Sequence, residues 1–268
     1  MTELAVVGCS GSGPGPTSAA SCYLVRTTAA GTTTTVLLDL GSGAFGALLG
    51  MIDPRTVDAI VLSHLHADHC LDMCAWDVAA AHSATAPWPP VATYAPAGAY
   101  ERLARAAEVD DPAEAELARS FDFRVPAEGT SVRVGPLEVR LARVDHPVEA
   151  YAVRVDAPDG TLVYSGDTGP CAALTELARG ADVLVAEATF ADPIDTPGAP
   201  APPAGLHLTG RQAGECAAAA GVGTLVLTHV PAWEEPGARA AEAGRVFTGR
   251  IVLARPGLRV PVGAGRPE

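Results

Sequence analysis

Short apolar segments alternate with polar, Gly-rich or Pro-rich segments along most of this chain. In the first half, the apolar runs predict strands at residues 4–7, 23–26, 36–40 and 59–62. Two helical stretches follow at residues 71–82 and 100–107. The prolines at 87, 89 and 90 separate them, because proline is not tolerated inside a helix. The first half is therefore expected to be rich in β-strands.

The second half repeats this scheme. Strands are predicted at residues 131–134, 137–144, 151–155, 161–164, 183–186 and 225–227. Helices are predicted at residues 174–179 and 210–220, and Thr209 has the side chain of an N-cap for the second of these. Strands and helices that alternate in this way indicate a layered α/β protein.

A cluster of histidines follows the predicted strand 59–62 directly. Alternate side chains of an extended segment point the same way, so His64 and His66 are expected to face together, while Asp68 and His69 turn the other way. Imidazole and carboxylate groups at this density are typical of a metal site. Two pairs of ligands favour two adjacent ions that share a water, an arrangement that can produce hydroxide at neutral pH.

Three further candidate ligands stand where other predicted strands end. They are His146, Asp167 and His229. A carboxylate such as Asp167 can bridge two cations, whereas an imidazole normally binds one. We therefore expect one ion on His64, His66 and His146, a second ion on Asp68, His69 and His229, and Asp167 between them. This donor set suits Zn²⁺, and Mn²⁺ or Fe²⁺ fit it as alternatives.

The order of these residues resembles the signature of the metallo-β-lactamase superfamily, His-x-His-x-Asp-His followed by a distant His, Asp and His. The resemblance covers nearly the whole chain and implies a four-layer αββα sandwich with the metals at one edge. Within the superfamily the chain looks most like the ribonuclease Z branch and its phosphodiesterase relatives. It is closest to the actinobacterial cyclic-nucleotide phosphodiesterases of this fold. The segments that carry this narrower match are Gly8-Cys9-Ser10-Gly11-Ser12, Ser21-Cys22-Tyr23-Leu24-Val25, Glu187-Ala188-Thr189, His207-Leu208-Thr209, Tyr164-Ser165-Gly166-Asp167-Thr168-Gly169 and Leu227-Thr228-His229-Val230-Pro231-Ala232-Trp233.

The resemblance also implies roles for individual residues. Glu187 and His207 would act as a pair beside the metals, with His207 helping the leaving group depart. Asp39 would support the metal-binding loop. The expected catalytic residues are His207, Glu187 and Asp68, the last also being a ligand. The implied activity is hydrolysis of 3′,5′-cyclic nucleotides such as cAMP to 5′-monophosphates by a hydroxide that bridges two divalent ions. Dimers are common in the resembled family, so a homodimer is an open expectation.

The charge of the chain bears on the choice of substrate. The formal net charge is −13, from 31 acidic and 18 basic residues, and every basic residue is Arg. Proteins that bind long nucleic acids generally neutralise phosphates with a concentrated positive surface. Nucleic acid is therefore an unlikely partner on composition, and a small anionic substrate is favoured.

The predicted ligands run from His64 to His229, so a split into two domains would cut through the site, and residues 1–268 are expected to form one domain. No apolar run approaches the roughly 18 residues of a membrane helix. Met1-Thr2-Glu3 does not begin a secretory signal, which favours a cytoplasmic protein with its six cysteines as free thiols. Cys70 and Cys74 lie near His69, but the ligand set is sufficient without them.

Several other features of the sequence have more than one interpretation. Trp76 and Trp233 are candidates for stacking on a base, although Trp is more often found in a core. The run from Gly8 to Gly15 could present amides to a phosphate. Residues 192–205 contain five prolines and form either a loop over the site or an inert connection. A Gly- and Pro-rich tail from about Pro256 is expected to be weakly ordered.

Three other functions compete with the cyclic-nucleotide phosphodiesterase. A tRNA 3′-processing endonuclease could use the same residues, but the composition and the lack of a long Gly- and Lys-rich arm oppose it. A hydrolase of another ester, a thioester or a lactone is compatible with the fold, since a fold does not fix function. A sensor that is not a catalyst would be expected to have lost at least one ligand.

Overall fold

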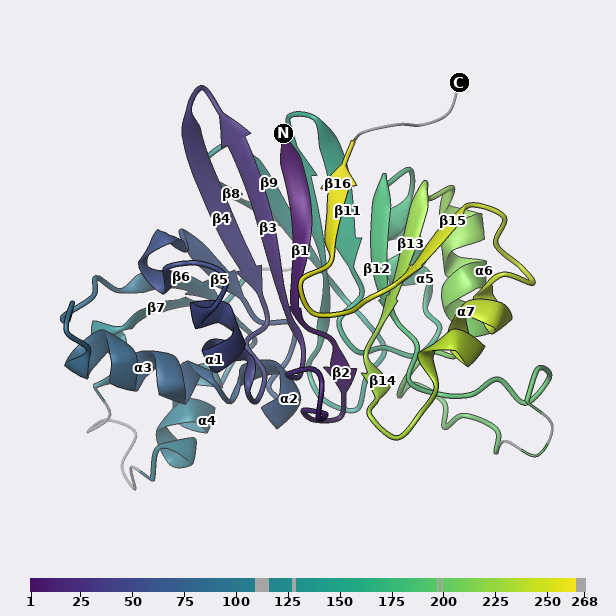
Figure 1. Ribbon diagram of the computed structural model, residues 1–268, viewed down its shortest axis with the longest axis horizontal. Coiled ribbons are helices and arrows are strands. Elements are labelled where there is room, and N and C mark those ends of the chain that lie inside the picture. Colours follow the sequence, from purple (N-terminus) through teal and green to yellow (C-terminus); the bar gives the residue numbers. More distant parts are fainter. Residues whose placement is uncertain (109–115, 127–128, 197, 199, 264–268) are drawn as a thin grey trace.

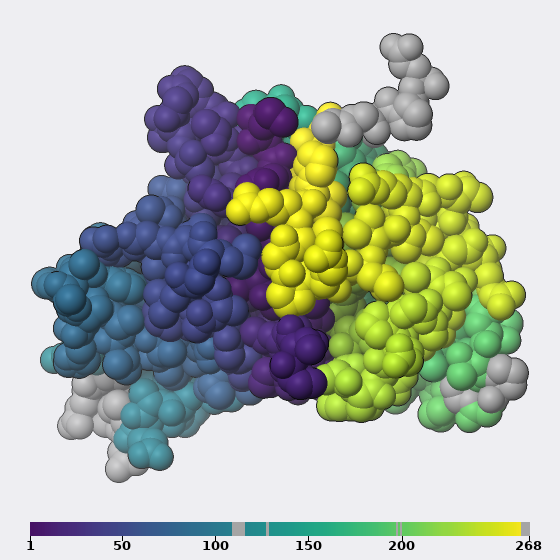
Figure 2. Space-filling view, viewed as in Figure 1, coloured from purple at the N-terminus to yellow at the C-terminus, as the bar shows by residue number. Residues whose placement is uncertain are grey.

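The computed structural model describes residues 1–108, 116–126, 129–196, 198 and 200–263. Two seven-stranded sheets lie face to face, and helices cover the outer face of each sheet (Figure 1). This is the αββα sandwich that the sequence predicts. In Figure 2 the N-terminal segment, in purple, lies between the blue helical region of one half and the yellow-green region of the other.

The first sheet comes from the N-terminal half, except for one strand contributed by the C-terminal end. In spatial order its strands are β16 (Arg259–Val262), β1 (Thr2–Gly8), β3 (Cys22–Ala29), β4 (Thr32–Leu38), β5 (Ala59–Val61), β6 (Val91–Tyr94) and β7 (Phe121–Arg124). Its outer face carries α1 (Ala44–Leu49), α3 (Met73–His82) and α4 (Ala99–Ala106). In β1, Leu4 and Val6 pack between the sheets, while Ala5 and Val7 pack under the helices. Both faces of this strand are therefore buried.

The second sheet is built from the C-terminal half. Its strands in spatial order are β15 (Arg250–Leu253), β13 (Thr224–Thr228), β12 (Val183–Glu187), β11 (Gly160–Tyr164), β10 (Tyr151–Ala157), β9 (Leu137–Arg143) and β8 (Ser131–Val134). Its outer helices are α5 (Ala172–Ala178), α6 (Gly210–Ala220) and α7 (Pro236–Ala243). The N-cap predicted for α6 is confirmed, because Thr209 and Gln212 form a reciprocal capping box.

One expectation for the C-terminal segment is wrong. The chain from about Pro256 was expected to be weakly ordered, yet Arg259–Val262 forms β16 and pairs antiparallel with β1. Val260 and Val262 alternate with exposed residues and are buried between the sheets. Apolar burial on one face is enough to order this strand despite its flanking glycines and prolines. Residues 264–268 of the expected tail lie outside the described residues.

The topology brings distant segments to one edge of the sandwich. Strands β4 to β7 run parallel, as do β11, β12, β13 and β15, so their carboxyl ends open on common edges. The short α2 (Ala67–Cys70) and the two-stranded pair β2 (Ser10–Gly11) and β14 (Val230–Pro231) lie together at the lower edge in Figure 1. Loops at such strand ends are the usual location of sites in α/β proteins. No helix in the described part of the chain is both long and apolar enough to span a membrane.

Candidate metal centre

The histidine cluster follows β5 as a loop that ends in one helical turn. His64 and His66 lie in the loop, whereas Asp68 and His69 lie on α2. The helical turn separates the second pair from the first. The two pairs of side chains therefore point in different directions, as predicted from the sequence. A turn of helix, rather than a continued strand, separates them.

The first group of donors consists of three imidazoles. His64 Nε2 lies 3.1 Å from His66 Nδ1, and His146 Nε2 lies 3.3 Å from the same atom. His64 is fully buried, while His66 and His146 are partly exposed. The three ligand atoms lie within 4.8 Å of one another, as a shared cation requires.

The second group joins α2 to the end of β13. His229 Nε2 lies 3.2 Å from His69 Nε2 and 3.1 Å from Asp68 Oδ2. His69 Nε2 is 3.4 Å from the same Asp68 oxygen. Together with Asp167, these residues form a second set of four donors, again with all ligand atoms within 4.8 Å.

Asp167 links the two groups. Its Oδ2 lies 3.7 Å from His64 Nε2 and 3.5 Å from His229 Nε2, and its Oδ1 lies 3.3 Å from His69 Nε2. The side chain is almost completely buried, and within the described part of the chain Oδ1 makes no hydrogen bond. A buried carboxylate oxygen without a donor is costly unless a cation neutralises it. Asp167 therefore lies within reach of ligand atoms in both groups, and its free oxygen fits a bound cation.

Three imidazoles are oriented by hydrogen bonds on their outer nitrogens. His69 Nδ1 lies 2.7 Å from Asp39 Oδ2, and His146 Nδ1 lies 2.9 Å from the carbonyl oxygen of Leu206. His229 Nδ1 lies 2.9 Å from the Thr189 hydroxyl, which itself donates to Glu187. A proton on each Nδ1 leaves the Nε2 lone pair facing the cluster, which is how metal-binding imidazoles are normally held.

The buried environment also sets the protonation states. Burial lowers the pKa of His64 well below its usual value, which favours the neutral imidazole. Burial and the neighbouring His146 lower the pKa of His66. Burial would raise the pKa of Asp68 and Asp167, but the surrounding histidines outweigh it and hold both below the usual range. Neutral nitrogens and ionised oxygens are the forms in which these groups bind metal.

A positive charge is favoured at the centre of the second group. Burial would lower the pKa of His69, yet Asp167 and Asp39 outweigh it and raise that pKa well above its usual value. The two carboxylates thus keep His69 protonated when no other cation is present. The chemistry of the donor set therefore fits divalent metal ions.

Asp39 supports the loop as the resemblance implies. Its two oxygens accept bonds from the Ser63 backbone N–H at 2.6 Å, the Ser63 hydroxyl at 2.7 Å and the Tyr164 hydroxyl at 2.7 Å, besides the contact with His69. Asp39 is fully buried and has a φ of 59°, a left-handed conformation that is uncommon outside glycine. Its hydrogen bonds compensate the strain and fix the His69 ring.

The glycine-rich run near the N-terminus allows a close approach to His229. A Cβ at Gly11 would lie 2.1 Å from the carbonyl oxygen of His229, so only glycine fits where β2 pairs with β14. The backbone nitrogen of Ser12 lies 3.4 Å from His229 Nε2. The Ser12 amide at this turn therefore faces the site. The close approach of the backbone to His229 explains why residue 11 is a glycine.

Glu187 and His207 form a hydrogen-bonded pair beside the two groups. His207 Nδ1 lies 2.9 Å from Glu187 Oε1, and the His207 ring lies 5.5 Å from the His146 ring and 5.6 Å from the His229 ring. Burial would lower the pKa of His207, but Glu187 raises it above the usual value. Glu187 also accepts bonds from the Thr168 N–H and the Thr189 hydroxyl. Since protein donors already occupy its oxygens, Glu187 is better placed to orient His207 than to bind an ion.

Two sequence-based alternatives are wrong. Trp76 packs against Phe45 and Trp88 in the core beneath the helices, so it cannot stack on a substrate. Cys70 is fully buried, and burial raises the pKa of its thiol to about 12, which disfavours the thiolate that a metal needs. The described cysteines are all free thiols, as predicted.

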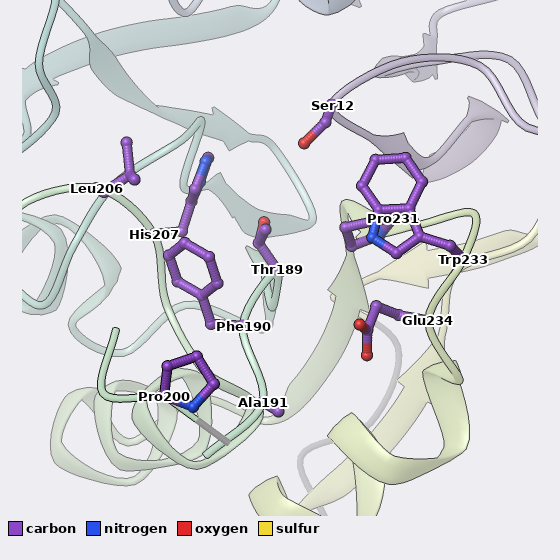
Figure 3. Close-up of a pocket in the computed structure, with 10 residues that line it drawn as sticks. All are labelled: Ser12, Thr189, Phe190, Ala191, Pro200, Leu206, His207, Pro231, Trp233 and Glu234. Carbon is purple, nitrogen blue, oxygen red and sulfur yellow. The ribbon is translucent and has the colours of Figure 1, made fainter. Parts of the chain in front are cut away.

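The Pro-rich segment 192–205 borders a pocket. The pocket has a volume of about 340 Å³, and Pro200 and Leu206 lie on its wall with His207 (Figure 3). Trp233 also lines it and is 75% exposed. Pro197, one of the five prolines of the segment, lies outside the described residues. Of the two interpretations of this segment, a loop beside the site fits better than an inert connection.

Some residues of the site have supporting roles that were not predicted from the sequence, although two of them stand in segments that carry the resemblance. Ser63, Tyr164 and Thr189 orient charged groups, and Phe190 packs edge-on against His207 with 5.4 Å between ring centroids. Only their position directly before or after a predicted site residue, or at the end of its strand, could have drawn attention to them.

Comparison with known proteins agrees with this geometry. The model of a family described as the beta-lactamase superfamily domain matches residues 34–230. An uncharacterized protein of Mycobacterium leprae is 42% identical over 93% of this chain and 84% of its own length. A ribonuclease Z of Mycolicibacterium paratuberculosis is 33% identical over 98% of this chain and 99% of its own. The crystal structure of the metallo-beta-lactamase fold protein YhfI from Bacillus subtilis superposes with a TM-score of 0.81, at 25% identity over 97% of this chain and 98% of that one.

The comparisons correct one expectation about partners. Composition alone disfavours nucleic acid, yet a ribonuclease matches this chain over almost its whole length. The prediction that nucleic acid is an unlikely partner is therefore not supported. Net charge does not show how charges are distributed around a site.

Proposed function

The chain belongs to the metallo-β-lactamase superfamily and is a metallo-hydrolase of that fold, and from this premise we propose that it hydrolyses phosphodiesters. The proposed substrates are 3′,5′-cyclic nucleotides such as cAMP, and the products are 5′-monophosphates. The observation that carries this proposal is the Glu187–His207 pair, which stands beside the metal-ligand groups with an acid ready for a leaving oxygen.

In this proposal two divalent ions occupy the cluster. His64, His66 and His146 would hold one, Asp68, His69 and His229 the other, and Asp167 would contact both. The nitrogen-rich donor set favours Zn²⁺, with Mn²⁺ or Fe²⁺ as alternatives. Such ions, when bound, lower the pKa of water so that it can attack at neutral pH, and they neutralise phosphate charge.

His207 would act as the general acid. Glu187 holds its Nδ1, and among the described residues nothing hydrogen bonds to its Nε2, which is therefore available to carry the proton. Hydrolysis forms a bond between phosphorus and the oxygen of water and breaks the bond between phosphorus and the 3′ oxygen. The departing 3′ oxygen takes its proton from His207 and leaves as a hydroxyl.

Asp68 is proposed as a catalytic residue as well as a ligand. It is the carboxylate at the entrance of the second group, buried less completely than Asp167, and its Oδ2 is within 3.4 Å of two imidazoles. A carboxylate in this place can hold the attacking water in line with the phosphorus. Loss of Asp68 would therefore remove both a ligand and an orienting group.

A second candidate function is tRNA 3′ processing, and the similarity to a ribonuclease Z over nearly the full chain favours it. The same acid and metal ligands could serve that reaction. The chain has no Lys and a formal net charge of −13, but net charge does not show how cations are distributed around the site, so composition does not exclude this function. Hydrolysis of another ester, a thioester or a lactone would not need the Glu187–His207 acid. The partner that we propose is therefore a small anionic substrate.

The test is a direct comparison of two substrates. Protein of known metal content is incubated with 3′,5′-cAMP and, separately, with a pre-tRNA that carries a 3′ trailer, and Asp68→Ala is the control. We expect the intact protein to convert cAMP to AMP and the variant to lose at least about a hundredfold in rate. Cleavage of the trailer without turnover of cAMP would contradict the proposal and favour tRNA 3′ processing.

A further inference from the structure

The pocket in Figure 3 lies on the His207 side of the metal cluster and is formed by two loops. Thr189, Phe190 and Ala191 follow β12, whereas Pro231, Trp233 and Glu234 belong to β14 and the turn after it. Of the seven proposed metal ligands, none lines this pocket. The pocket is therefore separate from the two groups of metal ligands. It lies next to His207, the residue that would protonate the leaving group.

The walls of the pocket present flat apolar surfaces. Phe190 and Trp233 lie on opposite sides of it (Figure 3), and the Phe190 ring is fixed edge-on against His207. Trp233 is 75% exposed, so it contributes little to the core. The volume of about 340 Å³ falls in the lower range of small-molecule sites, which is roughly 300–1,000 Å³. These dimensions and ring faces suit a planar ring system.

The charge on the lining selects among planar groups. Apart from His207, none of the ten residues around the pocket is basic, and Glu234 contributes a carboxylate. Arg239 Nη2 lies 2.8 Å from Glu234 Oε2, which holds the side chain in place and leaves Oε1 to accept another bond. Arg239 balances the charge of Glu234, so the side chain acts here mainly as a hydrogen-bond acceptor, and its Oε1 can accept a bond from an amino group.

We propose that this pocket binds an uncharged, amino-bearing nucleobase, stacked between Phe190 and Trp233 and hydrogen bonded through its amino group to Glu234. The inference rests on the proposed function, since it places the base of a mononucleotide beside the acid that releases its 3′ oxygen. It narrows the substrate class to nucleotides whose base carries an amino group, such as adenine.

The first test measures binding without hydrolysis. Adenosine has the base but no phosphate, so its dissociation constant, measured by calorimetry on the metal-loaded protein, reports this pocket alone. We expect Trp233→Ala to weaken adenosine binding at least about tenfold, because stacking on an aromatic ring contributes strongly to the binding of bases. Trp233→Phe should retain most of the affinity. Val78→Ala, at an exposed apolar residue on α3, is the matched control and should change nothing.

Purine riboside, which lacks the amino group, tests Glu234. The wild-type protein should bind it about fivefold or more weakly than adenosine, and Glu234→Ala should remove the difference. Equal affinity of the wild-type protein for both nucleosides would overturn the role of Glu234. Failure of adenosine to bind, or equal binding by Trp233→Ala, would overturn the pocket assignment.

A kinetic comparison separates this inference from the proposed function. The two substrates are cAMP and a ribose 3′,5′-cyclic phosphate without a base. If both are hydrolysed, Trp233→Ala should raise KM for cAMP about tenfold and leave the base-free substrate unchanged. Equal effects on both would overturn the pocket assignment and leave the phosphodiesterase standing. Adenosine binding that depends on Trp233, without turnover of either cyclic phosphate, would contradict the proposed function and retain the pocket.

Discussion

A single buried carboxylate fixes the orientation of the metal-binding loop. Asp39 accepts hydrogen bonds from Ser63 and His69, which flank the metal-binding loop, and from Tyr164 on β11. The short contact with Asp39 orients the His69 ring, and ligands held in this way need little reorganisation when an ion binds. The precision of the site therefore depends on residues that would touch neither ion nor substrate.

At this scale the sequence predicts which histidines and aspartates come together, but not the residues that support them. All seven proposed ligands could be found because they follow apolar strands in a characteristic order. Thr189 and Tyr164 could not, because their roles depend on partners 40 and 125 residues away in the chain. Local pattern carries no information about such pairs.

The proposed acid leads to a prediction about leaving groups. His207→Ala should lower kcat/KM for cAMP by about 10²–10⁴-fold, since the 3′ oxygen is a poor leaving group that needs a proton. The loss on bis(p-nitrophenyl) phosphate should be far smaller, because p-nitrophenolate departs without one. Steady-state kinetics on both substrates check this, and equal losses on the two would remove the acid role.

The pH profile provides a second readout of the same residue. Glu187 raises the pKa of His207, so the protonated acid persists to a higher pH than in an ordinary histidine and is lost as the pH rises through the raised pKa. The wild-type kcat/KM for cAMP should therefore be level below that pKa and fall above it. In His207→Ala this fall should be absent.

At the scale of elements, α7 holds the loop that carries the acid. Glu242 accepts bonds from the backbone N–H groups of Asp192 and Gly210, which stand at the two ends of the segment containing His207. Glu242 is paired with Arg239, and both side chains are 2% exposed. The helix was not predicted from the sequence, because its buried face combines the charged Arg239 and Glu242 with small alanines and shows no stripe of large apolar residues.

Removal of this pair should destabilise the fold. Glu242→Ala leaves Arg239 buried with fewer partners and two backbone donors unsatisfied, so the free energy of unfolding should fall by about 3–5 kcal/mol. Glu176→Ala, in an exposed pair with Arg179, is the matched control and should lower the free energy of unfolding far less, because solvent screens an exposed pair. Urea denaturation measures both. Comparable losses in the two variants would show that Glu242 does not anchor the loop.

Other elements differ in how far they could be predicted. The strands β1, β3, β4, β5 and β8 to β13 were located because apolar runs with turn residues on either side are a strong local signal. The single turn α2 and the strands β6 and β7 were missed, since the residues of β6 and β7 mix apolar and polar side chains and form no apolar run. Their structure is imposed by the sheet and the site around them.

At the scale of the whole molecule, the site exists because two sheets from different halves meet at one edge. The first sheet brings the residues of the β5–α2 loop, and the second brings Asp167, Glu187 and His229 at the ends of parallel strands. Each half alone would expose an incomplete set of donors. We therefore propose that residues 1–268 act as one domain, in which folding assembles the metal centre.

The most direct test of this account measures turnover against bound metal. Metal-free protein is titrated with Zn²⁺, and at each point the metal content per chain and the rate of cAMP hydrolysis are determined, with Asp167→Asn alongside. The activity should rise as the second ion binds and level off at two ions per chain. Asp167→Asn should lose the second ion and most of the activity. Full activity with one ion or none would contradict the dinuclear centre.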